Sequence, residues 1–179
     1  MKSTVSTRYS HIQRRLHWLM AFLVLAAYLL TERGILFQPG STGCAVLRQG
    51  HFWVGLLLLA LVWWRLASRG RLGVPPITPP LDHRTMLASI VMHVALYAFF
   101  LVMPILGLAT MWSNGTAMLI PFTGIAVPAL LPENQVLART LEDLHGTIGK
   151  VFYWVIGLHV LASLWHHFFR CDDTLRRML

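Results

Sequence analysis

The sequence is poor in charged residues and poorest in acidic ones. Charged side chains make up 12% of the 179 residues and hydrophobic ones 56%, which excludes an ordinary soluble domain. Seven Asp and Glu stand against fifteen Lys and Arg, giving a net charge of +8. Because the cations lie between long apolar runs, membrane topology explains them better than nucleic-acid binding. We therefore expect an integral protein of the lipid bilayer that binds no nucleic acid.

Cysteine is also scarce. Cys44 and Cys171 are the only two, and no Cys-x-x-Cys-His motif occurs, so covalent c-type haem attachment is unsupported. The topology described below places these two residues on opposite sides of the bilayer, which excludes a disulfide by distance. The polar N-terminal lead is followed by an apolar run without a small-residue cleavage pattern, which predicts a retained first span.

Four apolar segments are long enough to span a membrane, at residues 15–37, 44–67, 84–112 and 144–170. Residues 113–141 are apolar in the middle but are broken at Pro121, Pro128 and Pro132. This segment therefore cannot span, and we expect it to fold over the bundle or to lie in the interface. The expected fold class is all-α, with residues 1–179 forming a single transmembrane four-helix bundle.

The distribution of Lys and Arg predicts the orientation of this bundle. The N-terminal lead, the connector from Arg65 to Arg84 and the tail from Arg170 hold four, four and three of them, which is eleven of the fifteen. The positive-inside rule therefore predicts that both termini are cytoplasmic.

Four of the nine histidines are expected at matched membrane depths. His145 and His159 are fourteen residues apart, so they share one helix face and lie about 21 Å apart along the helix axis. The predicted orientation puts His51 on the outer side with His145, and His17 on the inner side with His159. Unpaired imidazoles among apolar side chains are costly in hydrocarbon, so we expect each pair to bind a common group.

Neutral imidazoles that face each other across a helical bundle are typical ligands of haem iron. We therefore predict two b-type haems, each held by two histidines. A zinc or copper site is the alternative, but the Cys, Asp or Glu ligands that match such sites are absent at that depth. For any one histidine alone, an interfacial position without a metal is the simpler interpretation.

The remaining histidines leave the inner site open. His93 is expected at nearly the depth of His159 and competes with His17 as the inner ligand. Alternatively, His93 and His166 are neutral donors that hold quinone carbonyl oxygens and pass protons. For His166 and His167, an ordinary interfacial girdle is an equal alternative.

Motifs spread over nearly the whole chain carry a resemblance to a known family. They are RLHW at Arg15 to Trp18, the His51 turn with Gly55, HVALYAFFLVMPILGL from His93, IGLH at Ile156 to His159 and WHHFFR from Trp165. With these motifs the chain resembles the bacterial cytochrome b561 family, which extends to the cytochrome b subunits of hydrogenases and formate dehydrogenases. The resemblance implies a multi-pass protein of the bacterial inner membrane.

The same resemblance implies a ligand set. It implies that His17 and His159 hold an inner haem and that His51 and His145 hold an outer one. By resemblance again, His93 and His166 are the candidates for a quinone site.

The small diheme relatives include superoxide oxidases, which take an electron from periplasmic superoxide and reduce ubiquinone near the inner haem. We therefore expect a superoxide:ubiquinone oxidoreductase. The alternative is a cytochrome b anchor that relays electrons between a partner dehydrogenase and quinone, and a histidine-lined transporter is a third class. Superoxide is an anion, so Arg33, Arg48, Arg139 or Lys150 on the outer side are candidates to steer it. Pairing of these cations with haem propionates, or interfacial anchoring, is the alternative.

Overall fold

The computed structural model describes residues 8–32, 37–38 and 40–179. Within these ranges it has four helices long and apolar enough to cross a membrane, and no named strand: α1 (His11–Thr31), α3 (Thr42–Leu72), α4 (His83–Ser113) and α5 (Gln135–Phe168). A short 3-10 turn, η1 (Arg176–Met178), follows near the C-terminus. The predicted all-α membrane fold is therefore confirmed.

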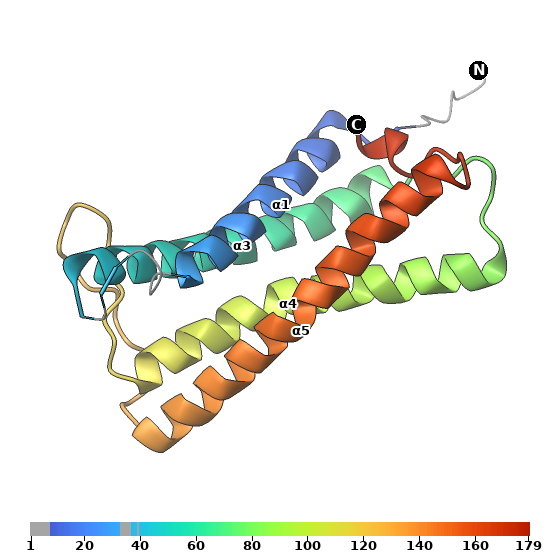
Figure 1. The fold of residues 1–179 in the computed structure, drawn as a ribbon. Helices are drawn as coiled ribbons and strands as arrows, with labels where there is room; N and C mark the ends of the chain where they lie inside the picture. Colours follow the sequence, from blue (N-terminus) through green and yellow to red (C-terminus); the bar gives the residue numbers. More distant parts are fainter. Residues whose placement is uncertain (1–7, 33–36, 39) are drawn as a thin grey trace.

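The helices form two crossing pairs (Figure 1). α1 packs against α3, α4 packs against α5, and contacts between α3 and α4 join the pairs. The apolar core lies inside the first pair and consists of Leu16, Met20, Leu23 and Val24 of α1 with Leu58, Leu61 and Val62 of α3. These residues recur at helical spacing, so each set lines one face of its helix.

The outward faces of the helices are also apolar. Phe22, Val94, Trp154 and Leu161 are each more than half exposed. Such side chains are unfavourable in water but suit contact with lipid tails, which are equally apolar. The surface of the bundle therefore agrees with its assignment as a membrane protein.

Helix boundaries follow capping residues rather than the ends of the apolar runs. Ser10 and Gln13 form a capping box, so α1 begins at His11, four residues before the predicted start. The Asn134 side chain accepts hydrogen bonds from the backbone N–H groups of Val136 and Leu137, at 3.1 and 3.0 Å. This cap lets α5 begin nine residues before the predicted residue 144. Hydropathy marks only the part of a helix inside the hydrocarbon, and these helices continue beyond it. α1 ends at Thr31, while residues 33–36, which the predicted first span includes, lie outside the described ranges.

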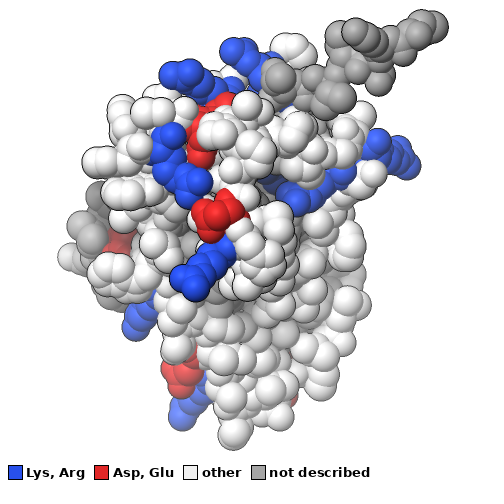
Figure 2. Space-filling view, turned by 90° about the vertical axis from the view of Figure 1, so that its right-hand side faces the viewer, with Lys and Arg blue, Asp and Glu red and all other residues white. Residues whose placement is uncertain are grey.

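Polar contacts join distant parts of the chain at one end of the bundle. Gln13 Nε2 donates to the Gly73 carbonyl at 3.0 Å, and Arg65 donates to the Gln13 carbonyl at 3.0 Å. Trp18 Nε1 donates to the Met178 carbonyl at 2.9 Å. Figure 2 looks onto the side of the molecule that holds the C-terminus and shows Lys and Arg side chains spread over it, with Asp and Glu among them. The positive-inside rule assigns this end to the cytoplasm.

The segment between α4 and α5, residues 114–134, lies at the opposite, outer end. It contains no helix, and Leu119 and Ala126 form an isolated antiparallel bridge in it. The segment runs past the outer end of α3 before it returns to α5 (Figure 1). The prolines thus prevent a fifth span, as predicted. Cys44 lies at the outer end of α3 and Cys171 lies after α5, and neither forms a disulfide bond within the described ranges.

Candidate functional site

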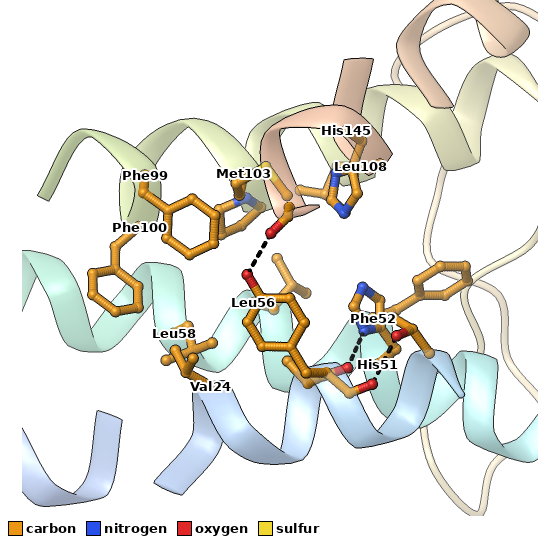
Figure 3. A pocket seen from close by; sticks show the side chains of 18 of the residues that line it. Val24, His51, Phe52, Leu56, Leu58, Phe99, Phe100, Met103, Leu108 and His145 are labelled. Carbon is orange, nitrogen blue, oxygen red and sulfur yellow. Dashed lines mark hydrogen bonds between the residues drawn. The ribbon is translucent and has the colours of Figure 1, made fainter. Parts of the chain in front are cut away.

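Two histidines face each other near the outer end of the bundle (Figure 3). His51 of α3 and His145 of α5 have ring centroids 6.2 Å apart, with the ring planes at 73°. His51 Nδ1 lies 3.0 Å from the carbonyl oxygen of Ala27 in α1. Because a carbonyl oxygen only accepts, Nδ1 carries the proton of the neutral ring, and the lone pair lies on Nε2. The backbone of α1 thus orients the His51 ring and fixes its tautomer.

The separation of these rings fits one metal ion between them. A bond from a metal to an imidazole nitrogen is about 2.0 Å long, and that nitrogen lies about 1.1 Å from its ring centre, so two collinear imidazoles on one ion have centres about 6.2 Å apart. The hydrogen bond on the other nitrogen of His51 is the outer-shell contact that ligand histidines usually make. The outer pair therefore has the ring separation, and His51 has the tautomer, that two histidines holding one haem iron would need.

An apolar cavity of about 290 Å³ adjoins this pair. All four helices contribute to its wall, and its apolar residues include Val24, Phe52, Leu56, Leu58, Phe99, Phe100, Met103 and Leu108 (Figure 3). A macrocycle held by the two histidines needs such a space, because its faces and most of its edge are apolar.

Four glycines make room in the cavity: Gly55, Gly107, Gly146 and Gly149. A Cβ added at Gly55 or Gly146 would point into open space, with no neighbour within 4 Å, and one added at Gly107 would lie 3.1 Å from His145 Cε1. Gly55 and Gly149 each follow a histidine of the pair by four residues, so they lie on the same helix face one turn away. Side chains at these positions would fill the space beside the imidazoles.

The rim of the cavity is polar. Thr31, Glu32 and Lys150 contribute to its lining. Tyr28 donates a hydrogen bond to the Gly149 carbonyl at 2.9 Å and also packs against Tyr153, with ring centroids 4.1 Å apart. These contacts tie α1 to α5 beside the cavity. Among the four candidate steering cations, Lys150 lines the cavity and Arg33 lies outside the described residues; Arg48 and Arg139 are not part of the lining.

Three histidines meet in the inner half of the bundle. The ring centroids of His17 and His159 are 6.3 Å apart at 77°, which nearly repeats the geometry of the outer pair. His93 also contacts His159, with centroids 5.8 Å apart at 83°. His93 Nδ1 donates to the Ser89 carbonyl at 2.6 Å, so its own lone pair lies on Nε2. The fold thus places both candidate inner ligands, His17 and His93, next to His159.

Larger ligand sets are not formed. Within the described ranges, no three His, Cys, Asp or Glu side chains converge so that they could hold one metal ion. Zinc sites in proteins normally use three or four protein ligands. The arrangement therefore suits a metal that brings its own equatorial ligands, as haem iron does, better than a bare ion.

His166 is held by an acidic residue that sequence reasoning missed. His166 Nδ1 lies 2.5 Å from Asp172 Oδ2, and the side chain of Asp172 is only 1% exposed. Arg170 Nε lies 3.8 Å from the same oxygen, and the Thr174 backbone N–H donates to Asp172 Oδ1 at 2.9 Å. Burial raises the pKa of the Asp172 carboxyl, but the hydrogen bonds from His166 and Thr174 outweigh it and hold that pKa below its usual range. Asp172 therefore stays ionised and accepts a hydrogen bond from His166 Nδ1.

The sequence contains a weak signal for this contact. Asp172 and Asp173 follow the WHHFFR motif by two and three residues, but no helical spacing relates them to His166, because the chain turns at Cys171 with φ +54°. No ring contact joins His166 to His93 or His159 among the described residues. The structure therefore groups His93 with the inner pair and places His166 in a separate polar contact.

Comparison with known proteins gives matches over nearly the full length. The family model described as "Prokaryotic cytochrome b561" matches residues 8–179. "Cytochrome b561 homolog 1" of Escherichia coli (strain K12) is 32% identical over 172 residues, which cover 96% of this chain and 97% of that protein. A Yersinia pestis protein named "Probable superoxide oxidase CybB" is 35% identical over 173 residues and 96% of each chain. "Cytochrome b562" of Cereibacter sphaeroides is 28% identical over 182 residues, 96% of this chain and 94% of that protein.

Proposed function

The chain belongs to the prokaryotic cytochrome b561 family, and from that premise we propose that it is a diheme superoxide oxidase that reduces ubiquinone. The family consists of b-type cytochromes of the bacterial inner membrane that bind haem and transfer electrons. The observation that carries the diheme proposal is the repeated geometry of two histidine pairs, with ring separations of 6.2 and 6.3 Å. The name of the Yersinia pestis relative supports the choice of superoxide as donor.

In this proposal His51 and His145 hold the outer haem, and His17 and His159 hold the inner one. Bound haem irons supply one-electron chemistry, taking up and releasing single electrons. The overall reaction converts two superoxide anions, one ubiquinone and two protons into two O₂ and one ubiquinol. Each superoxide gives up one electron, and the quinone gains two electrons and two protons, so charge and atoms balance.

The chain's own residues have separate tasks at the outer end. The Ala27 carbonyl orients His51 through its Nδ1–H. The apolar wall of the cavity excludes water from the histidine pair. Lys150 on the rim attracts an anion toward this cavity, while Glu32 on the same rim reduces the positive field.

At the inner end, His93 and His166 are proposed to bind the quinone carbonyl oxygens. His93 donates its Nδ1 proton to the Ser89 carbonyl, so Nε2 of the neutral ring accepts a hydrogen bond from a quinol hydroxyl and donates to a quinone carbonyl only when the ring is doubly protonated. Asp172 accepts a hydrogen bond from His166 Nδ1, so a proton taken up at His166 Nε2 can be passed to the reduced quinone. Asp172 is thus a positioning residue for a proton donor.

The proposed reaction is tested by counting its products. Purified haem-loaded protein in liposomes with ubiquinone-1 receives superoxide from xanthine oxidase, and O₂, H₂O₂ and ubiquinol are measured together. Superoxide oxidation yields one O₂ per superoxide and ubiquinol, whereas dismutation yields half an O₂ per superoxide and H₂O₂. We expect ubiquinol to appear at the expense of H₂O₂, and added superoxide dismutase to suppress it.

A failure of this assay separates the two candidate roles. If superoxide reduces the haems no faster than it dismutates while ubiquinol still reduces them, the superoxide oxidase proposal is rejected. Electron exchange with quinone alone would then favour the cytochrome b anchor, which needs a partner dehydrogenase as donor.

Replacement of Asp172 by Asn is expected to slow ubiquinone reduction by about tenfold to a hundredfold, because the carboxylate that orients His166 is lost. Haem reduction by superoxide should keep its rate, since it occurs at the other end of the bundle. Stopped-flow absorbance resolves the two steps. Asp173→Asn is the matched control: Asp173 bonds Thr78 instead of a histidine, so quinone reduction should persist. Equal slowing of both steps in Asp172→Asn, or no rescue by Asp172→Glu, would argue for a purely structural role.

A further inference from the structure

The segment between α4 and α5 presents an apolar surface on the outer side of the protein. Residues 114–132 contain no charged residue. Ile125 and Leu130 are well exposed, Ile120 is partly exposed, and the side chain of Phe122 is completely exposed. A loop of this composition is unexpected in water, where connecting segments are normally polar.

This surface is carried by an ordered hairpin, residues 118–127, which we call the outer hairpin. Val127 N–H donates to the Met118 carbonyl at 2.7 Å, and Ile120 N–H donates to the Ile125 carbonyl at 2.8 Å. Met118 is fully buried. The hairpin therefore has a buried anchor at its base and turns its apolar tip outward.

Two side chains of α3 fix the hairpin in place. Gln49 donates to the Ala117 carbonyl at 2.8 Å and accepts from the Leu119 N–H at 2.9 Å, and Trp53 Nε1 donates to the Leu119 carbonyl at 2.9 Å. These three hydrogen bonds satisfy backbone groups next to the bridge. The base of the hairpin is therefore attached to α3 at a defined level of the bundle.

The depth of the hairpin along α3 and the side of α3 on which it lies both indicate contact with the membrane. At 100° per residue, Gln49 and Trp53 each lie about 160° around α3 from His51, so the hairpin sits on the side of α3 away from the cavity. Trp53 lies about 3 Å nearer to the membrane centre along the axis than His51 does. Tryptophan at such a depth is typical of the membrane interface.

We propose that the outer hairpin is embedded in the interface of the outer membrane leaflet, with Phe122 and Ile125 in contact with lipid. The same side of α3 exposes Val46 and Leu57, so the hairpin continues the apolar surface that lipid covers. An interface for a protein partner normally has a polar and charged rim around an apolar centre. Residues 114–132 contain no charged residue that could form such a rim. The inference is independent of the electron donor and acceptor.

The test measures the depth of labelled side chains in membranes. In the haem-loaded protein with Cys44→Ser and Cys171→Ser, nitroxide labels are attached at Phe122→Cys or Ile125→Cys after reconstitution into phosphatidylethanolamine and phosphatidylglycerol liposomes. Power-saturation electron paramagnetic resonance compares collisions with O₂, which concentrates in lipid, and with a water-soluble nickel chelate. Val94→Cys on the exposed face of α4 is the lipid reference, and Glu142→Cys near the outer start of α5 is the aqueous reference.

We expect labels at 122 and 125 to favour O₂ over the nickel chelate, on the side of the Val94 reference. Accessibility to nickel equal to that of the Glu142 reference at both sites overturns the proposal, because the hairpin then projects into water. Dipolar broadening that persists when labelled protein is diluted with unlabelled lipid also overturns it, because the hairpin then contacts a second copy of the chain.

Discussion

Replacing His51 by alanine is expected to remove one of two haems per chain and to abolish superoxide-driven ubiquinone reduction. His51 is proposed as a direct ligand of the outer haem, and loss of a direct ligand should cost more than the about 10- to 100-fold in metal affinity that outer-shell partners cost. Neither residue of the inner pair, His17 and His159, lines the outer cavity, so the second haem should remain. Pyridine haemochrome assays count the haems, and reduced-minus-oxidised spectra show which one is lost. Loss of both haems would contradict two independent pairs.

A second variant, which keeps both histidines, distinguishes loss of the outer haem from general unfolding. Gly55→Leu places a side chain in the open space one turn from His51 and should also exclude the outer haem. Gly70→Leu is the matched control, because it makes the same change on the same helix where the residue is exposed and outside the cavity. If Gly55→Leu retains both haems with unchanged spectra, the cavity is not the haem site.

Replacing His17 by alanine is expected to remove the inner haem, whereas His93→Ala should keep both haems. The centroid distance from His17 to His159 matches that of the outer pair, while the 5.8 Å from His93 is shorter than two collinear metal bonds require. In His93→Ala the defect should lie in quinone reduction, with a raised KM for ubiquinone-1. Haem counts and steady-state kinetics on the two purified variants check both expectations.

The opposite pattern would reverse the assignment. If His93→Ala loses the inner haem and His17→Ala retains it, His93 is the ligand and the proposed quinone site loses one of its two residues. His83→Ala serves as the control, because His83 starts α4 as an exposed residue and should affect neither haem content nor KM.

Much of the site could be predicted from spacing, because a spanning helix has few degrees of freedom. Fourteen residues between His145 and His159 set both their shared face and their depth, and the distribution of cations set which end is cytoplasmic. The structure then pairs each of them with the histidine expected at its depth. Prediction of helix ends was poorer, since Ser10 and Asn134 extend helices beyond the hydrocarbon by side-chain capping that hydropathy does not register.

The sequence by itself determined the all-α membrane fold and the family and predicted the depths of the histidines, because each depends on local composition and on regular helical geometry. Only the tertiary structure decided that the Ala27 carbonyl holds His51, that Asp172 turns back onto His166, and that Gln49 and Trp53 carry the outer hairpin. These contacts join different helices, or segments beyond a turn of the chain. Their distances depend on how elements pack in three dimensions, which no residue spacing along the chain specifies.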